Sequence, residues 1–366
     1  MEIDTDLAYS NKKHTRYTNP FGLQYLPYEE WQGNGKYFFI EHFRRREELD
    51  YIKELHKPNV FLILHDILEG FAYRRFSKID SFVVKNNLQG KVFFATSLLD
   101  AEKEYAKWPL SGNFKTFYYP EWYHRVYDNL IDYRLHKIKY LKPTYFCCLN
   151  NRPHPHRLQT VTLIDYFDLL DKGIVTCLDT QYETLNNRMP YEQNVMSYNQ
   201  NYTQEISFIL NNQKEITKTK LPLNFDTEDF SRGSRPHDYN NMIYNECLIN
   251  VVTETHYGKE HNLHHHIFFS EKIWKPIVCK QAFIMVGPQY SLRYLRELGF
   301  KTFDSIWDES YDELPEDKRL YKAIETLYNI INKHSVEELN SVTLEIRKHN
   351  FKHFQKIRKE MVKTCW

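Results

Sequence analysis

Short runs of apolar residues, most of them followed by an amphipathic segment, constrain the fold of this chain most strongly. These runs lie at residues 59–66, 91–97, 144–150, 174–178 and 282–287. A strand buried on both faces of a parallel sheet gives such a run, whereas a half-exposed strand gives an alternating pattern. The order strand, helix, strand therefore predicts an α/β fold with parallel sheets.

The length of the chain and the spacing of these runs indicate two domains. At 366 residues the chain exceeds the usual size of one domain, and the pattern restarts after residue 143 with the strand at 144–150. We predict a Rossmann-like domain over 1–143 and a second one over 144–340. A terminal helix over 341–366 is predicted to pack back across the domains.

Periodicity predicts the other elements. Helices are expected at 41–56, 98–108, 121–141, 158–173, 270–280, 291–299, 316–334 and 335–362, and a further strand at 245–255. Gly173 is expected to end the helix before it. Residues 186–241 are rich in Asn and show no regular pattern.

Composition and charge exclude several classes of protein. Hydrophobic residues make up 42% and charged residues 27% of the chain, which is ordinary for a globular protein. The net charge of +1 argues against a dedicated nucleic-acid binder. Six cysteines without a CxxC motif predict neither a disulfide framework nor a cysteine zinc site. With no apolar run long enough to span a membrane and no apolar leader, we expect a cytoplasmic location, in a bacterium or, for a viral protein, in its host.

Basic and polar residues follow the predicted strand at 144–150. They are Asn150, Arg152, His156 and Arg157. Open α/β sheets bind ligands at the carboxyl ends of their strands, and an arginine at the start of a helix suits a phosphate. The segment is therefore a candidate phosphate site; the alternative is a solvated loop whose arginines cap nearby helices.

A second candidate lies at the start of the helix expected at 270–280. Ser270 is a typical N-cap residue, and Glu271, Lys272 and Lys275 follow it. A lysine in the first turn is electrostatically disfavoured, so Lys272 indicates an anion nearby. Glu271 would accept from ribose hydroxyls, while Lys272 or Lys275 would meet a phosphate. The alternative is a plain cap followed by an ordinary acid and a surface lysine.

The sequence SEKIWKPIVCKQAFIMVG, residues 270–287, resembles the donor-binding motif of the α-1,3-fucosyltransferase and exostosin-like GT-B glycosyltransferases. The segment 144–173 is similar to the first βαβ unit of that donor domain. Residues 290–319 are similar to glycosyltransferase-like proteins of phages and large viruses. Fucosyltransferases usually have a small or Gly-rich turn where this chain has residues 278–281, so the resemblance does not extend to GDP-fucose as the donor. It covers roughly 144–330 and implies a GT-B fold, with two facing Rossmann-like domains and the donor in the second.

The resemblance also implies an activity. The chain would move a sugar from a nucleotide diphosphate sugar, its co-substrate, to an acceptor hydroxyl, with no tightly bound cofactor and no required divalent metal. Glu271 would bind the ribose, and Arg152, Arg157 and Lys272 would bind the diphosphate. Glu254, at the end of the strand at 245–255, would lie near the donor sugar; a strand-end acid in solvent is an equal alternative.

Two classes of acceptor fit this activity, and two other functions are alternatives to glycosyl transfer. The acceptor is either a glycan, lipid-linked saccharide or protein, or a hydroxymethylated base in viral DNA. DNA would need a basic rim, for which the candidates are Arg44, Arg45, Arg46, Arg74 and Arg75. The near-neutral charge favours the glycan. The alternatives to transfer are a non-catalytic GT-B-like protein that binds a nucleotide or sugar, and a nucleotide-sugar epimerase or hydrolase.

An inverting reaction needs a base that activates the acceptor hydroxyl. His65 and Asp66 end the predicted strand at 59–66, and Glu69 follows them. Asp66 is the first candidate base, with Glu69 as its rival. The alternative interpretation is a core histidine beside a helix-capping aspartate.

Other patterns carry less weight. His261, His264, His265 and His266 lack an accompanying HExxH motif and are interpreted as a loop bordering the donor site. The chain has no P-loop and no GxGxxG motif, which argues against P-loop kinases and typical dehydrogenases.

Two groups of aspartates are set aside for similar reasons. Asp4 and Asp6 mimic the DxD of metal-dependent GT-A enzymes but are expected in a frayed terminus. Asp304, Asp308 and Asp312 are expected in an acidic surface turn, with contacts to sugar hydroxyls as the alternative.

Overall fold

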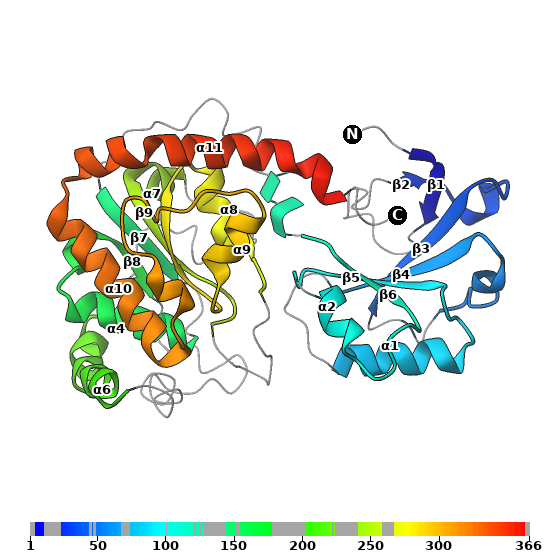
Figure 1. Cartoon of the computed structure of the whole chain (residues 1–366), viewed down its shortest axis with the longest axis horizontal. Helices are drawn as coiled ribbons and strands as arrows, with labels where there is room; N and C mark the ends of the chain where they lie inside the picture. The colour runs from blue at the N-terminus through cyan, green and yellow to red at the C-terminus, as the bar shows by residue number, and fades with distance from the viewer. Residues whose placement is uncertain are drawn as a thin grey trace. The chain divides into compact units, whose positions relative to one another are not determined.

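The computed structural model describes residues 4–10, 23–43, 46, 49–66, 74–99, 101–120, 122–124, 126–127, 144–150, 154–177, 203–221, 223, 241–257 and 267–362. The chain divides into two units (Figure 1). Unit 1 comprises Met1–His124, His261–Phe269 and Lys356–Trp366, and unit 2 comprises Arg125–Glu260 and Ser270–Gln355. The predicted boundary at residue 143 lies outside the described residues. Each unit has its own parallel sheet, so the α/β fold class with two Rossmann-like domains and a C-terminal helix is confirmed.

Among the described residues, unit 1 is built on a six-stranded sheet. Its strands are β1 (Asp4–Ser10), β2 (Leu23–Tyr25), β3 (Lys36–His42), β4 (Val60–Asp66), β5 (Val92–Thr96) and β6 (Lys115–Tyr118). The strand order is β2-β1-β3-β4-β5-β6, and all neighbours are parallel. The carboxyl ends of β3, β4 and β5 therefore meet at one edge of the sheet, where His42 pairs with His65 and Asp66 pairs with Thr96.

Helices of unit 1 cover one face of this sheet. They include α1 (Arg74–Lys85) and α2 (Ala101–Ala106), together with the 3-10 turns η1 (Tyr28–Glu30) and η3 (Glu54–His56). The apolar side chains of α1, among them Phe76, Ile79 and Phe82, recur at helical spacing and are buried against the strands. A second apolar cluster, which includes Phe38 and Ile63, lies on the strands as a separate group.

Two predictions for unit 1 are wrong. The helix expected at 41–56 is not formed, because β3 extends to His42 and among the described residues that follow only short 3-10 turns occur. The buried run Tyr37–Ile40 has the pattern of a central strand. The strand continues to His42 and so takes up the first residues of the range for which the spacing of apolar residues predicted a helix. Asp4 and Asp6, expected in a frayed terminus, lie in β1, which pairs with β3.

In the part of the chain that the structure describes, unit 2 is built on a four-stranded sheet whose order reverses in its middle. Its strands are β7 (Thr144–Asn150), β8 (Gly173–Cys177), β9 (Cys247–Thr253) and β10 (Ala282–Val286). They are parallel and follow the order β10-β9-β7-β8. The chain winds outward from β7 in one direction to β8 and in the other to β9 and β10. The switch point of this doubly wound sheet therefore lies between β7 and β9, where such sheets bind ligands.

The helices of unit 2 follow the expected pattern with some changes. They are α4 (Pro155–Tyr166), η4 (Leu170–Lys172), α6 (Gln204–Thr219), α7 (Asn241–Glu246), α8 (Glu271–Val278), α9 (Ser291–Glu297), η8 (Ser310–Glu313), α10 (Glu316–Lys333) and α11 (Val336–Val362). Helix α4 packs against α6 and α10. On α11, Arg347 is buried and donates to the carbonyl of Lys280, 2.9 Å away, just beyond the end of α8.

Three predictions for unit 2 need correction. Helix α4 begins at Pro155 and not at residue 158, because Pro is well suited to the first helical position. Gly173 opens β8 and does not end a helix; a Cβ there would lie 2.6 Å from the ring of Phe146. Helix α6 lies in the range 186–241 that was expected to be irregular.

Candidate functional site

The carboxyl ends of β7 and β9 are joined by a polar contact at the switch point. Asn150 is the last residue of β7, and Thr253 is the last residue of β9. The hydroxyl of Thr253 donates to Oδ1 of Asn150 at 2.6 Å. Both residues are buried. This contact holds the two strands together at the point where a ligand of the sheet is expected.

The start of α4 supplies two buried basic side chains to this point. His156 and Arg157 lie in its first turn and are 2% and 4% exposed. The backbone carbonyl of Glu254 accepts from His156 Nε2 at 2.8 Å and from Arg157 Nη2 at 3.4 Å. Burial and the nearby Arg157 lower the pKa of His156 well below its usual value, so the imidazole is neutral and carries its proton on Nε2.

The start of α8 approaches the same residue from the other side. Ser270 is the N-cap of α8, and its Oγ accepts from Lys272 N at 3.3 Å. The hydroxyl of Ser270 donates to Oε2 of Glu254, and the Ser270 backbone N–H donates to both carboxylate oxygens at 3.3 and 3.4 Å. Glu254 is completely buried, and burial raises the pKa of its carboxyl against the attraction of Lys272.

Lys272 lies between Glu271 and the end of β9. Its Nζ is 3.0 Å from Oε1 of Glu271 and 3.3 Å from the hydroxyls of Thr255 and Ser270. Burial raises the pKa of Glu271, but the Lys272 and Lys275 ammonium groups outweigh it and hold the pKa below its ordinary value. The side chain of Lys272 is 25% exposed, whereas that of Glu271 is 13% exposed. Glu271 is therefore an ionised carboxylate at neutral pH, beside a cation that solvent can reach.

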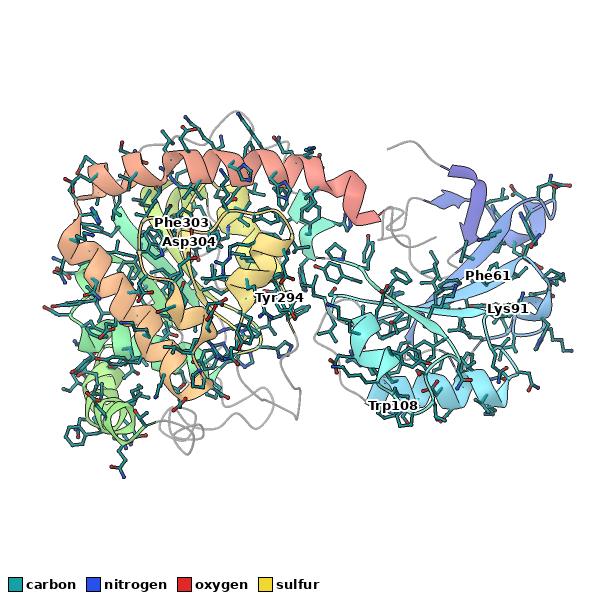
Figure 2. The ribbon with its side chains drawn as sticks, in the orientation of Figure 1. Phe61, Lys91, Trp108, Tyr294, Phe303 and Asp304 are labelled. Carbon is teal, nitrogen blue, oxygen red and sulfur yellow. The ribbon has the colours of Figure 1, made fainter. Side chains whose placement is uncertain are left out.

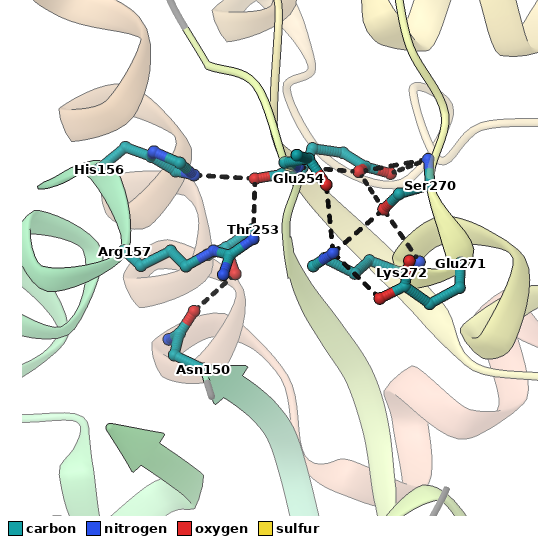
Figure 3. A network of polar contacts seen from close by, with 9 residues as sticks. Asn150, His156, Arg157, Thr253, Glu254, Ser270, Glu271 and Lys272 are labelled. Atoms are coloured by element: carbon teal, nitrogen blue, oxygen red, sulfur yellow. Dashed lines mark hydrogen bonds and ion pairs between the residues drawn. The ribbon is translucent and has the colours of Figure 1, made fainter. Parts of the chain in front are cut away.

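The two candidate segments, far apart in the sequence, thus meet on Glu254 (Figure 3). Arg157 and His156 bind its backbone carbonyl, while Ser270 binds its carboxylate. Because that carboxylate accepts from the N-cap residue Ser270, its negative charge lies at the start of α8 and offsets the positive end of this helix. Helix α4 differs, since its N-cap residue His154 makes no side-chain capping hydrogen bond.

Two residues that the sequence analysis did not single out, Tyr257 and Arg319, complete this edge. Tyr257 stacks on His156 with ring centroids 5.6 Å apart and an interplanar angle of 13°. The guanidinium of Arg319 lies 4.7 Å from the centroid of Tyr257. Arg319 is 3% exposed and donates to the carbonyls of Gly287, Leu314 and Tyr257 at 3.1, 2.9 and 2.7 Å. In the sequence it stands in a charged run, PEDKR, that is typical of a solvated helix start.

Of the three aspartates singled out in the acidic turn, Asp312 is the buried one. Asp304 and Asp308 are exposed, and Asp308 Oδ1 accepts from Ser310 N at 2.9 Å. Asp312 is buried, and its carboxylate accepts from the backbone N–H groups of Leu292 and Arg293 at 3.0 and 3.1 Å. Asp312 therefore occupies the start of α9.

In unit 1, the candidate base is engaged in an ion pair. Oδ2 of Asp66 lies 2.6 Å from Nη1 of Arg75, and the two side chains are 6% and 14% exposed. The ring of His65 lies 5.3 Å from the ring of His42, at 88°. Arg75 also lies over the ring of Phe43, 5.5 Å from its centroid. The ion pair places Arg75 beside Asp66 at the carboxyl edge of this sheet.

Several candidate residues lie outside the described residues. They are Glu69, Arg44, Arg45, Arg152, His261, His264, His265 and His266. In the part of the chain that the structure describes, no three His, Cys, Asp or Glu side chains are grouped so as to hold a metal ion. No helix of that part is both long and apolar enough to cross a membrane.

Comparisons with known proteins give a distant likeness. No protein-family model matches the chain, and no curated protein matches it by sequence. Among solved structures, it is similar to the trehalose-6-phosphate synthase OtsA, with a TM-score of 0.42 and 10% identity, over 92% of this chain and 74% of that one. It is also similar to an alpha,alpha-trehalose-phosphate synthase (UDP-forming) from Burkholderia vietnamiensis, with a TM-score of 0.41 and 8% identity, over 90% of this chain and 70% of that one. Similarity this distant does not extend to substrate or activity.

Proposed function

We propose that this chain is a glycosyltransferase that binds a nucleotide diphosphate sugar in unit 2 and moves its sugar to an acceptor hydroxyl. The observation that supports this most is the convergence of Arg157 and Lys272 on the two sides of Glu254. This convergence lies at the switch point of a doubly wound sheet, where nucleotides bind. Two cations there match the charge of a diphosphate.

The leaving group explains why these residue types are needed. As the bond to the sugar breaks, negative charge develops on the diphosphate, and preorganised cations and helix amides stabilise it. Arg157, at the start of α4, offers a planar fork of donors to phosphate oxygens. Lys272 would exchange its contacts with Ser270 and Thr255 for a phosphate oxygen. These residues supply the required charge, so the proposal includes no divalent metal and no tightly bound cofactor.

The remaining residues of the site have separate roles. Glu271, ionised beside Lys272 and Lys275, would accept hydrogen bonds from the ribose hydroxyls. Glu254 is completely buried, so it would act by holding the start of α8 in place and not by touching the sugar. Arg152 is proposed to assist on the diphosphate.

Unit 1 would provide the acceptor side. Asp66, at the end of β4, is the proposed base, with His65 beside it and Glu69 as the rival. To act as the base, Asp66 would take up the proton while it faces the Arg75 guanidinium, 2.6 Å away. The proposed acceptor is a glycan, a lipid-linked saccharide or a protein, and a hydroxymethylated base of DNA is the second version.

Donor consumption tests the proposal. The purified chain is incubated with a panel of UDP, GDP, ADP, CMP and dTDP sugars, with and without glycan or hydroxymethylated DNA acceptors, and in the presence of EDTA. Glycosyl transfer predicts nucleotide release that depends on the acceptor and survives EDTA. Acceptor-independent release or isomerised sugar would instead assign a hydrolase or an epimerase. Nucleotide binding without consumption of any donor would assign a non-catalytic binding protein.

A further inference from the structure

We propose that Tyr290, Arg293 and Tyr294 form the subsite for the nucleobase of the donor. They lie between the end of β10 and the first turns of α9, at the same edge of the sheet as Glu254. This inference rests on the proposed function, since it assigns one part of the nucleotide to residues that the diphosphate contacts leave unused.

The loop that carries Tyr290 leaves the sheet directly beside Glu254. A Cβ added to Gly287 would lie 3.4 Å from Cβ of Glu254 and 3.3 Å from Oγ of Ser291. A glycine is therefore favoured where this loop begins. Arg319 fixes the same point by donating to the carbonyl of Gly287 at 3.1 Å. The position of Tyr290, three residues further on, is thus tied to the proposed diphosphate site.

Tyr290 has a backbone conformation that bulky residues rarely adopt. Its φ is 69°, in the left-handed region, where a large side chain is disfavoured. Its N–H donates to the carbonyl of Asp312 at 2.9 Å, and the neighbouring Gln289 donates to the carbonyl of Glu313 at 2.7 Å. The η8 turn therefore holds the strained residue in place. Strain of this kind persists where the surrounding structure imposes it, often at ligand sites.

The three side chains form a surface suited to a flat ring. Cζ of Arg293 lies 4.2 Å from the ring centroid of Tyr290 and 5.2 Å from that of Tyr294. Tyr290 and Tyr294 are partly exposed, and the side chain of Arg293 is 46% exposed. Figure 2 shows Tyr294 at the periphery of unit 2. Aromatic rings and guanidinium planes stack on nucleobases, because every base presents a π face.

Competing uses of these groups are weak. Arg293 also faces Glu297 at 3.7 Å, but both side chains are about half exposed, and exposed pairs of this kind contribute little. The backbone amides of Leu292 and Arg293 already donate to Asp312, so the start of α9 is taken by a carboxylate and not by a phosphate. The subsite is therefore suited to the base end of the nucleotide.

The spacing of the strands fits a nucleotide laid along the edge. Tyr290 follows β10 and Arg157 follows β7, with β9 between those strands. Neighbouring strands lie about 4.8 Å apart, so the carboxyl ends of β10 and β7 are separated by roughly 10 Å. A nucleoside diphosphate can span that distance, with its base on Tyr290 and its phosphates at Lys272 and Arg157.

Two probes separate the nucleobase subsite from the diphosphate site. Affinities for inorganic pyrophosphate and for the nucleoside diphosphate that binds best are measured by calorimetry on the full chain. Tyr290→Gly removes the ring and tolerates the left-handed backbone, so the variant is expected to fold. We expect it to weaken nucleoside diphosphate binding about tenfold or more while pyrophosphate affinity is unchanged. Tyr290→Phe keeps the ring and is expected to keep the affinity. Tyr328→Ala, which removes an exposed tyrosine of α10, is the matched control and should alter neither.

Each other outcome overturns the inference. An unchanged nucleoside diphosphate affinity in Tyr290→Gly would place the base elsewhere while leaving the proposed function standing. An equal loss of both probes would show that Tyr290 acts through the fold of the edge and not on the base. If the unaltered protein binds neither pyrophosphate nor any nucleoside diphosphate, the proposed function fails, and the subsite fails with it.

Discussion

The hydroxyl of Ser270 donates a hydrogen bond to the buried carboxylate of Glu254, and this contact fastens the first turn of α8 to the end of β9. Glu254 has no exposed surface, and its carboxylate also accepts from the backbone N–H groups of Thr255 and Ser270. The position of Lys272, in the first turn of α8, therefore depends on an acid that a ligand at the edge does not touch.

This arrangement predicts a loss of stability in Glu254→Ala. The variant leaves the buried donors of Ser270 without their acceptor, which is expected to lower the free energy of unfolding by about 1–3 kcal/mol. Glu254→Gln keeps one acceptor oxygen and should lose less. Urea denaturation measures both, with Glu297→Ala as the control, because Glu297 is 58% exposed. A loss in Glu254→Ala no larger than in the control would show that the contact contributes nothing.

Glu309 predicts a pH dependence of stability. Burial raises its pKa from the ordinary 4.5 to about 7, although Thr302, the N–H of Phe303 and Arg296 oppose the shift. The folded chain therefore binds this proton more tightly than the unfolded chain. Its contribution is fully present below pH 4.5 and is lost as the pH rises through about 7, up to about 3 kcal/mol. Glu309→Gln should remove this part of the pH dependence when unfolding by urea is compared at pH 5 and pH 8. The same slope in both proteins would contradict the assignment.

The two cations of the proposed diphosphate site predict a loss of nucleotide affinity. Lys272→Ala and Arg157→Ala should each weaken nucleoside diphosphate binding severalfold or more, because each removes a charge-assisted contact. Lys172→Ala is the matched control, since this lysine precedes β8 at the opposite edge of the sheet and is 46% exposed. Calorimetry gives the affinities, and thermal unfolding confirms that the variants are folded. Unchanged affinity in both variants would contradict the assignment of Lys272 and Arg157 to the diphosphate site.

The ion pair of Asp66 with Arg75 allows catalysis to be separated from stability. Asp66→Asn should leave donor binding intact and abolish transfer, and it should also destabilise unit 1, because it removes the negative charge that faces the partly buried Arg75 guanidinium. The double variant Asp66→Asn with Arg75→Gln is expected to recover stability but not turnover. Turnover that returns with stability would show that Asp66 is structural and that the base lies elsewhere.

Much of the fold could be predicted because its strands are continuous apolar runs. The strands at β4, β5, β7, β8 and β10 fall where the runs predicted them, since a parallel strand covered on both faces needs apolar residues at every position. Helix α6 was not predicted. Its polar residues are mixed with exposed apolar ones such as Phe208 and Ile216, which obscures the helical spacing. The helix is instead anchored by contacts that no local pattern records, such as the hydrogen bond from the Thr217 hydroxyl to Asp165 of α4.

The sequence predicted several residues of the site but not the contacts between them. Strand-end position and helix-start chemistry identified Arg157 and Ser270, but only the fold brings both onto Glu254. Arg319 and Tyr257 could not be found from the sequence, because a buried arginine bound to carbonyls has the same local pattern as an exposed one. The ion pair of Asp66 with Arg75 could not be predicted either, because the sequence around Arg75 has the pattern of a solvated helix face.

The most direct measurement for the central claim is a thermal-shift screen of the full chain with UDP, GDP, ADP, CMP and dTDP, with and without Mg²⁺. A ligand at about 100 times its Kd stabilises the folded state by about 2.7 kcal/mol, which is readily detected. We predict that one nucleoside diphosphate raises the Tm without Mg²⁺, and that Lys272→Ala loses the shift. No response to any of the five, or the same shift in the variant, would contradict a nucleotide site at the carboxyl edge of unit 2.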